Sequence, residues 1–409
     1  MTGQVPEPVV VPEPVEGRPL RVAMIGYGFM GAAHSVGWRQ APRMFDLPVD
    51  VEMAVVVGRN ADAVATAARR WGWAESASDW REVIARDDID IVDIVTPGDS
   101  HAEIAIAALQ AGKHVLVEKP LANTVAEAEA MADAAAAADD GVRAMVGFTY
   151  RRVPAVTLLR DLIAAGKVGR VQEVRASYRQ DWLVDPETPL AWRLQKEHAG
   201  SGALGDIGAH IIDMTQFVTG QSVAAVSGTV ETIVTQRPLL GAGSGLSGTA
   251  AEGYGEVTVD DVALFTGRLD GGALVSFEAT RFATGRKNAL AIEVSGDKGA
   301  LRFELEDLNT LQFYDRTAPA ELQGFTRILV TESAHPYVAA WWPAGHVLGY
   351  EHGFVHQAKD LVEAIAGGTA PHPSFAEGLA VQRVLDAVEQ SAADDSRWVR
   401  IEAHQPASA

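Results

Sequence analysis

The sequence predicts an α/β fold with two parts: a doubly wound parallel sheet, then an α+β domain with a large, mainly antiparallel open sheet. Strands alternate with helices over the first 150 residues, which is typical of a parallel sheet. Later strands follow one another through short connections, which favours antiparallel pairing. A glycine-rich turn at residues 26–31 comes directly after the first strand. The 409 residues leave room for both parts.

The first part contains five expected strands and five expected helices. Short apolar runs bounded by turn residues predict strands at 21–25, 51–57, 89–95, 114–117 and 143–148. The segments between them have helical patterns, with stop signals such as Gly112. These helices are expected to begin after the glycine turn and end near 40, and then to span 61–71, 79–85, 101–111 and 124–138.

The second part has helices at both ends and strands between them. Helices are expected at 154–165, 203–218, 354–365 and 375–393, and strands at 171–178, 224–234, 261–269, 273–281, 289–295 and 300–304. Residues 240–256 are rich in Gly, Ser and Ala, which predicts an exposed loop. We expect three segments: a flexible proline-rich tail at 1–18, a first domain at 19–148 and a second at 149–402.

Composition excludes several classes of partner. The chain has 34 basic and 54 acidic residues, a formal net charge of −20, which argues against nucleic acid or an anionic membrane surface. No apolar run reaches the roughly 20 residues of a membrane span. Cysteine is absent, which excludes disulfides and thiol catalysis and fits a cytoplasmic location.

The glycine turn has the spacing of a dinucleotide-binding fingerprint. Gly26 permits a tight turn, Gly28 allows backbone to approach a pyrophosphate, and Gly31 lets the helix pack closely on the strand. Phe29 and Met30 complete the turn. The following helix offers free N–H groups to phosphate. The other interpretation is a packing turn without a ligand.

The end of the second strand bears on which nicotinamide cofactor binds. An acid there reads the ribose of NAD, whereas an arginine accommodates the 2′-phosphate of NADP. This chain has Arg59 and Asn60, and its first acid is Asp62. The local pattern therefore favours NADP. In the alternative, Arg59 stacks on adenine and Asn60 binds the ribose.

Glu118, Lys119 and Pro120 end a strand at the edge where parallel sheets collect ligands. A lysine beside a nicotinamide could bond the substrate hydroxyl and share or take its proton. A solvent-facing lysine is the alternative. Thr96, Pro97 and His101 follow the preceding strand, where a nicotinamide ribose could lie; His101 could equally be an ordinary helix-start residue.

Asp206, His210 and Asp213 are spaced i, i+4 and i+7, which on a helix places them on one stripe. Two carboxylates beside one histidine suit orientation of a substrate and proton transfer. A capped helix with a buried core histidine is the alternative. Asp/His/Asp on one helix is too little for a metal site, and we expect no metal.

Polar and aromatic side chains gather at the start of the second domain. Indole rings cover C–H faces while Arg, Asp and Gln read hydroxyls, so this mixture suits a polyhydroxylated ligand. A domain-interface or oligomer patch is the alternative. The candidates are Tyr150, Arg152, Gln180, Asp181, Trp182, Trp192 and Arg193.

Taken together and in this order, these motifs resemble the Gfo/Idh/MocA oxidoreductases, the glucose–fructose oxidoreductase and inositol dehydrogenase family. The resemblance runs from Pro19 to about Glu402 and is strongest to the levoglucosan dehydrogenase branch, through stretches such as 150–154, 180–182, 192–193, 199–206 and 334–337. It implies an N-terminal Rossmann domain that binds NAD. It also implies a C-terminal domain that binds substrate and forms a homo-oligomer, a dimer or tetramer, through its open sheet.

The resemblance implies an NAD(P)-dependent dehydrogenase that oxidises a secondary hydroxyl, at C3, of a sugar, anhydrosugar, glycoside or inositol. Lys119, Asp206 and His210 match the family's catalytic set, and Asp213 a polar wall residue. The branch favours NAD over NADP. Two other functions stay open: glycoside cleavage by transient oxidation and elimination on tightly held NAD, and a non-catalytic dinucleotide-sensing regulator.

Overall fold

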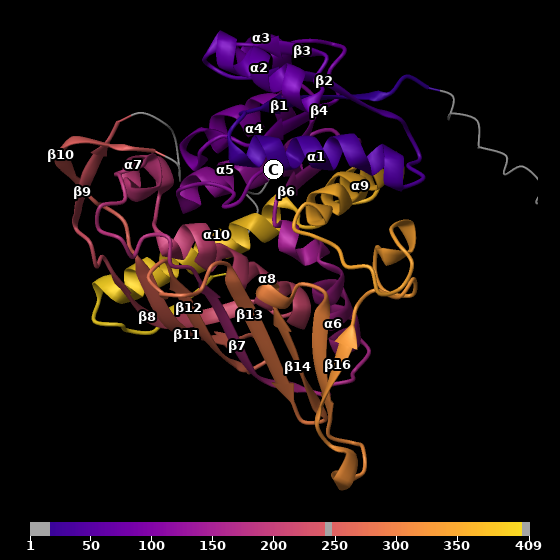
Figure 1. Ribbon diagram of the computed structural model, residues 1–409, viewed down its shortest axis with the longest axis vertical. Helices are drawn as coiled ribbons and strands as arrows, with labels where there is room; N and C mark the ends of the chain where they lie inside the picture. Colours follow the sequence, from indigo (N-terminus) through magenta and orange to yellow (C-terminus); the bar gives the residue numbers. More distant parts are fainter. Residues whose placement is uncertain (1–16, 242–247, 403–409) are drawn as a thin grey trace, which may run out of the picture.

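The computed structural model describes residues 17–241 and 248–402 (Figure 1). The expected flexible tail, residues 1–18, lies outside the described residues except for its last two positions. The described chain forms two large sheets, and the helices at its C-terminal end lie between them (Figure 1). Among the described helices, none combines the length and apolar composition needed to cross a bilayer.

The first sheet is wholly parallel and has the strand order β3-β2-β1-β4-β5-β6. Its strands are β1 (Leu20–Ile25), β2 (Val51–Val57), β3 (Glu75–Ala77), β4 (Ile91–Ile94), β5 (His114–Val117) and β6 (Ala144–Val146). Its connecting helices are α1 (Phe29–Met44), α2 (Ala61–Trp71), α3 (Trp80–Ile84), α4 (His101–Gln110) and α5 (Val125–Ala137). This order confirms the doubly wound fold, whose ligands bind where it reverses, beyond the carboxyl ends of β1 and β4.

The second sheet is mixed and has the order β16-β15-β14-β13-β7-β12-β11-β8-β17. All its pairings are antiparallel except that between β7 and β12, which confirms the expected mainly antiparallel sheet. The strands are β7 (Val171–Arg179), β8 (Val223–Glu231), β11 (Val262–Leu269), β12 (Leu274–Thr280), β13 (Ala289–Gly296), β14 (Gly299–Glu304), β15 (Thr310–Asp315), β16 (Phe325–Leu329) and β17 (Val399–Arg400).

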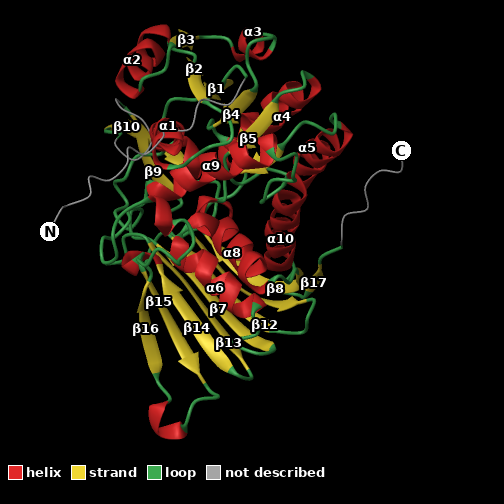
Figure 2. Ribbon diagram, turned by 90° about the vertical axis from the view of Figure 1, so that its right-hand side faces the viewer, coloured by secondary structure: helices red, strands yellow, loops and turns green. Residues whose placement is uncertain are grey.

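Helices cover one face of this second sheet. They are α6 (Pro154–Ala164), α8 (Ala209–Thr219) and α10 (Phe375–Ala393), and Figure 2 shows them on the same side of the strands. The alternation along β11 fits this arrangement, since Ala263 and Phe265 are buried whereas Leu264 between them is 47% exposed. The opposite face therefore stays open in the monomer.

The prediction of a loop over 240–256 was wrong at its C-terminal end. Residues 250–256 form β10 (Ala250–Glu256), which pairs with β9 (Gln236–Leu240). Nearly every residue of β10 is exposed, so the strand has no buried face to produce an alternating apolar pattern. The sequence also predicted no strand at β3, β9, β15, β16 or β17, which are short or lie at or next to a sheet edge.

The chain returns to the first sheet near its end. Helix α9 (His352–Ala366) packs along α1, and the two lie side by side in both views (Figures 1 and 2). The contact is close at Gly37, where a Cβ atom would lie 2.7 Å from the carbonyl oxygen of Phe354. The helix that would bind a pyrophosphate is therefore fixed from behind by a segment more than 300 residues away in the sequence.

We predict that Gly37→Ala lowers the free energy of unfolding by about 1–3 kcal/mol, because the added methyl meets backbone that cannot rotate away. Gly141→Ala is the matched control, since a Cβ there meets nothing within 4 Å, and its effect should stay within about 0.5 kcal/mol. Urea unfolding of both variants checks this. Equal stability of the two variants would contradict the close α1–α9 contact.

Candidate active site

The glycine turn has the shape needed to hold a pyrophosphate. Gly26 has φ +114°, and a Cβ there would lie 2.9 Å from Val95. A Cβ at Gly31 would meet the carbonyl oxygen of Gly26 at 2.9 Å, whereas one at Gly28 would meet nothing within 4 Å. Gly28 is also the N-cap of α1 and has no capping side chain, so the first N–H groups of the helix stay free. The turn therefore fits a dinucleotide.

Arg59 and Asn60 are exposed at the carboxyl end of β2. The Asn60 side-chain oxygen caps α2 by accepting a hydrogen bond from the Ala63 N–H at 3.0 Å. Its amide N–H groups are thus the part left to meet a ribose. On the other side of the turn, Phe29 is 65% exposed and stacks on Tyr350, with ring centroids 6.4 Å apart.

Lys119 and Asp206 meet across the two domains. The Lys119 ammonium donates to the backbone oxygen of Asp206 at 2.5 Å and to its Oδ1 at 3.1 Å. Arg281, which is fully buried just beyond β12, donates to Oδ2 of the same carboxylate at 2.9 Å. Burial raises the pKa of Asp206, but Lys119, Arg281 and Arg193 outweigh it and hold that pKa well below its usual range. Asp206 therefore stays ionised and acts as an anchor for cations.

His210 lies beside this pair inside a ring of aromatic side chains. Its imidazole centroid is 4.7 Å from that of Tyr150, 5.8 Å from Tyr178 and 6.1 Å from Phe148. Burial lowers the pKa of His210 and the Lys119 cation lowers it further, to well below its usual value. A neutral imidazole next to an ammonium is suited to accept a proton.

The segment that carries Asp206 is a π-helical turn, η4 (Leu204–Gly208), joined to α8. Asp260 holds its start, because its carboxylate accepts the N–H groups of Gly202 and Leu204, both at 2.7 Å. Gly202 must lack a side chain, since a Cβ would lie 1.7 Å from the Asp260 carbonyl oxygen. Such wide turns recur at functional sites. Neither the π-helical turn nor Asp260 was predicted from the sequence.

A chain of hydrogen bonds forms one wall next to His210. The Tyr150 and Tyr178 hydroxyls lie 2.9 Å apart, and the Tyr178 hydroxyl donates to Asn288 Oδ1 at 2.6 Å. Gln180 donates to the same oxygen at 2.8 Å and accepts from the Trp182 indole N–H at 3.0 Å. These five residues form one polar, aromatic surface; Tyr150, Gln180 and Trp182 were predicted from the sequence, and Tyr178 and Asn288 were not.

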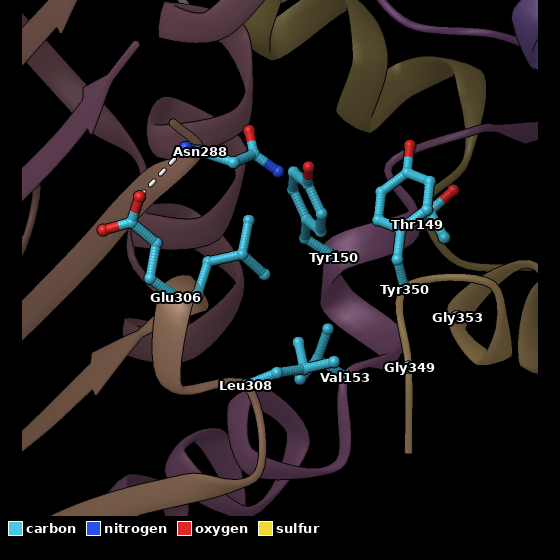
Figure 3. A pocket seen from close by; sticks show the side chains of 10 residues that line it. Thr149, Tyr150, Val153, Asn288, Glu306, Leu308, Gly349, Tyr350 and Gly353 are labelled. Carbon is cyan, nitrogen blue, oxygen red and sulfur yellow. Dashed lines mark hydrogen bonds between the residues drawn. The ribbon is translucent and has the colours of Figure 1, made fainter. Parts of the chain in front are cut away.

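The wall borders a cavity of about 120 Å³. In Figure 3, the Asn288 side chain points toward Tyr150, and Tyr350 lies on the far side of Tyr150. The Tyr150 and Tyr350 ring centroids are 6.4 Å apart. Neither Asn288 nor Tyr350 was among the residues predicted from the sequence, because neither lies in a recognisable motif.

Two arginines stack on tryptophans at the other side of Asp206. The Arg193 guanidinium lies 4.4 Å from the Trp192 ring centroid, and that of Arg281 lies 5.3 Å from the Trp182 ring centroid. Burial lowers the pKa of Arg193, while Asp206 opposes this shift. The predicted residues Trp182, Trp192 and Arg193 are therefore brought to the catalytic cluster.

Other predicted residues lie elsewhere or have a supporting place. Asp213 is buried and pairs with Arg151 through hydrogen bonds of 2.5–3.1 Å, whereas Asp206 pairs with Lys119 and Arg281, so the two carboxylates have separate partners. Arg152 is buried against Asp360, and Asp181 pairs with Lys287 at 2.7 Å.

The residues after β4 form a support for the cofactor edge. His101 is buried, and its ring nitrogens lie 2.9 Å from the Thr96 carbonyl oxygen and 3.1 Å from that of Pro120. Thr96 also accepts a hydrogen bond from Ser100 at 2.7 Å. His101 thus ties the segment that contains Pro97 to the Lys119–Pro120 segment.

Two family models match the chain. Residues 20–148 match the oxidoreductase family with an NAD-binding Rossmann fold, and residues 156–302 match the GFO/IDH/MocA C-terminal domain. The chain belongs to the Gfo/Idh/MocA family of oxidoreductases. It is an enzyme of that family, and its cofactor is NAD. The resemblance noted from the sequence, the fold class and the NAD expectation are confirmed.

Individual relatives of this Gfo/Idh/MocA chain cover almost its whole length. Levoglucosan dehydrogenase of Pseudarthrobacter phenanthrenivorans is 43% identical over 387 residues, 93% of this chain and 98% of the relative. Among solved structures, an oxidoreductase domain protein from Kribbella flavida is 61% identical with a TM-score of 0.90, covering 94% of this chain and 99% of its own. A levoglucosan dehydrogenase complex with NADH and levoglucosan is 41% identical with a TM-score of 0.88, covering 94% and 100%.

We predict that Asp213→Asn lowers the free energy of unfolding by about 3 kcal/mol, because buried Arg151 loses a charged partner. NADH affinity should not change, since Asp213 lies outside the cluster of Lys119 and Asp206. Urea unfolding and NADH fluorescence titration measure the two quantities. Asp161→Asn, in an exposed pair with Arg160, is the control and should change stability by less than about 1 kcal/mol. A destabilisation no larger than that of the control would contradict the structural role of Asp213.

Proposed function

We propose that this enzyme oxidises a secondary hydroxyl of a sugar, an anhydrosugar such as levoglucosan, a glycoside or an inositol to the ketone, at C3 of a sugar. The observation that supports it most is the convergence of Lys119 from one domain with Asp206 and His210 from the other. The similarity to levoglucosan dehydrogenase over nearly the whole chain supports the substrate class.

His210, Lys119 and Asp206 have different roles in the proposed reaction. We infer that neutral His210 accepts the hydroxyl proton, while the Lys119 ammonium donates a hydrogen bond to the same oxygen as negative charge develops on it. Asp206 holds the ammonium in place through two of its oxygens. NAD, when bound, supplies the hydride acceptor, so that alcohol and NAD⁺ give ketone, NADH and one proton.

The cofactor domain offers residues for each part of NAD. Gly26, Gly28 and Gly31, with Phe29 and Met30 beside them, would hold the pyrophosphate at the N-terminus of α1. Arg59 and Asn60 would meet the adenosine. The nicotinamide end would be bordered by the edge residues Thr96, Pro97, His101, Glu118 and Lys119.

The wall beside His210 is suited to a polyhydroxylated ring. Its phenol and amide groups can both donate and accept hydrogen bonds, and the nearby Arg193 guanidinium donates only. The indoles of Trp182 and Trp192 offer apolar faces. We propose Tyr150, Gln180, Trp182, Trp192 and Arg193 as substrate contacts. Asp181, Arg152 and Asp213 are left out of this set because their charges already have partners.

We also propose that the enzyme is a cytoplasmic homo-oligomer, a dimer or tetramer. The uncovered face of the nine-stranded sheet, with Leu264 and Leu274 each 47% exposed, is the surface that supports this assembly. Light scattering coupled to size-exclusion chromatography measures the mass in solution directly.

A substrate screen tests the proposed function. NAD⁺ and NADP⁺ reduction is followed with levoglucosan, glucose, xylose and myo-inositol, and the product is located by NMR. Net NADH formation with a 3-keto product is expected. Glycoside cleavage without net NADH would favour transient oxidation and elimination instead, and NADH binding without any turnover would favour a sensor.

We predict that Lys119→Ala lowers kcat by about 10²–10⁴-fold, because the developing oxyanion loses its hydrogen-bond donor. The variant should still bind NADH in a fluorescence titration, since the glycine turn is untouched. Lys196→Ala, at an exposed lysine paired with Glu389, is the control and should retain kcat. Retained turnover in Lys119→Ala would refute its role.

We predict that activity persists well below pH 6.5. The base must be neutral, and a lowered pKa means that His210 takes up its proton only at a pH well below its usual pKa. The acid limb of kcat/KM against pH should therefore lie below that of an exposed histidine, and activity is lost only as the pH falls through the lowered value. An acid limb at or above pH 6.5 would contradict His210 as the base.

A further inference from the structure

A second buried histidine lies outside the catalytic cluster, on the helix that follows the glycine turn. His34 of α1 is 2% exposed. Its Nδ1 lies 2.9 and 3.0 Å from the two carboxylate oxygens of Asp93 on β4, and its Nε2 lies 2.8 Å from Glu118 Oε1 at the end of β5. Trp38 donates its indole N–H to Asp93 Oδ2 at 2.7 Å. Three elements of the cofactor domain thus meet at one imidazole.

Both ring nitrogens of this imidazole face carboxylate oxygens. A hydrogen on each nitrogen lets the ring donate to Asp93 and to Glu118 at once, which favours its cationic form. Burial lowers the pKa of His34, but the two carboxylates outweigh it and raise that pKa to about 10. His101, in the same domain, faces carbonyl oxygens instead of carboxylates, and burial lowers its pKa. Because both rings are buried, the opposite directions of the two pKa shifts come from their different hydrogen-bond partners.

Glu118 connects this imidazole to Lys119. One carboxylate oxygen of Glu118 is held by His34 at 2.8 Å, and the other accepts the backbone N–H of Lys119 at 3.2 Å. Glu118 is itself buried, and Gly147 leaves room for its carboxylate, since a Cβ there would lie 2.9 Å from Oε1. A path of hydrogen bonds therefore runs from α1 to the backbone of Lys119.

We propose that His34 is a positioning residue: through its hydrogen bond it fixes Glu118, and through Glu118 it places Lys119 where its ammonium reaches Asp206. This inference rests on the proposed function, because it assigns the placement of Lys119 to a group that touches neither substrate nor cofactor. The same hydrogen bonds connect α1 to the end of β5, where Lys119 lies. In a merely structural role, His34 would affect stability and not turnover.

A charge-matched pair of variants tests this directly. In His34→Gln the amide can donate to only one of the two carboxylates, and its oxygen opposes the other. We expect kcat to fall by about 10²-fold, as for a displacement of a catalytic group by about 1 Å, with NADH binding retained. In the double variant His34→Gln/Glu118→Gln, the second amide supplies a donor for that oxygen and removes the unpaired charge. Its kcat should be about tenfold higher than that of His34→Gln.

Trp73→Phe is the matched control. Trp73 is a buried residue of the same domain that donates to Ser35 on α1 at 2.9 Å and contacts neither carboxylate through a hydrogen bond. Its loss should lower the melting temperature without lowering kcat. The control shows how far kcat changes when only stability is lost. If kcat of His34→Gln falls no more than its loss of melting temperature accounts for on that scale, the positioning role is overturned.

Three readouts do not need a substrate. Histidine ¹⁵N NMR of the wild-type protein should show a protonated His34 at pH 8, and a neutral ring there overturns the inference. A crystal structure of His34→Gln should show Lys119 shifted from Asp206, and an unmoved Lys119 overturns it. If His34→Gln does not fold, the double variant should melt at a higher temperature than His34→Gln. A double variant that is equally unstable overturns the inference that His34 balances the charge of Glu118. If the wild type oxidises none of the sugars, the proposed function fails while these three results still decide the role of His34.

Discussion

The candidate active site depends on one carboxylate that two domains share. Asp206 receives Lys119 from the end of β5 and Arg281 from the end of β12, so the same anion fixes cations that come from different sheets. Because its partners are cations, and their charges outweigh the effect of burial on its pKa, the carboxylate stays ionised. This arrangement leaves His210 neutral beside an ammonium, which is the combination that lets one group accept a proton while the other stabilises charge on oxygen.

Buried ions also fix the frame around the site. Arg151 joins α8 to α10 through Asp213 and Glu377, and Arg152 joins α9 and the segment before α10 through Asp360 and the His372 carbonyl oxygen. Removing a charge from water is expensive, and such clusters persist only where each group finds partners of suitable geometry. These clusters lie where segments distant in sequence meet, so they favour one arrangement of the two domains over others.

The polar wall beside His210, which we propose to contact the substrate, is built from many elements. Tyr150 precedes α6, Tyr178 lies on β7, Asn288 precedes β13, and Tyr350 comes just before α9. Each residue contributes one polar or aromatic group, and the hydrogen bonds among them hold the wall in one shape. Changes at any of these positions could alter which hydroxyl is presented to His210 without changing the catalytic cluster, which is consistent with a family whose members differ in substrate.

The sequence by itself determined the fold class, the family and the catalytic candidates Lys119, Asp206 and His210. These features depend on short stretches of sequence: the periodicity of strands and helices, a turn that only glycine allows, and motifs at strand ends.

Only the tertiary structure decided which groups meet. Arg281, Asp260 and Asn288 carry no local signal, because their partners are chosen by strand order and lie 56 to 110 residues away. Asp213 fits the stripe expected for a regular α-helix, but its carboxylate pairs with Arg151. Asp206 instead lies in a π-helical turn held at its start by Asp260, and pairs with Lys119 and Arg281. Periodicity can specify a helix face, whereas the partner of a buried charge depends on how distant segments pack.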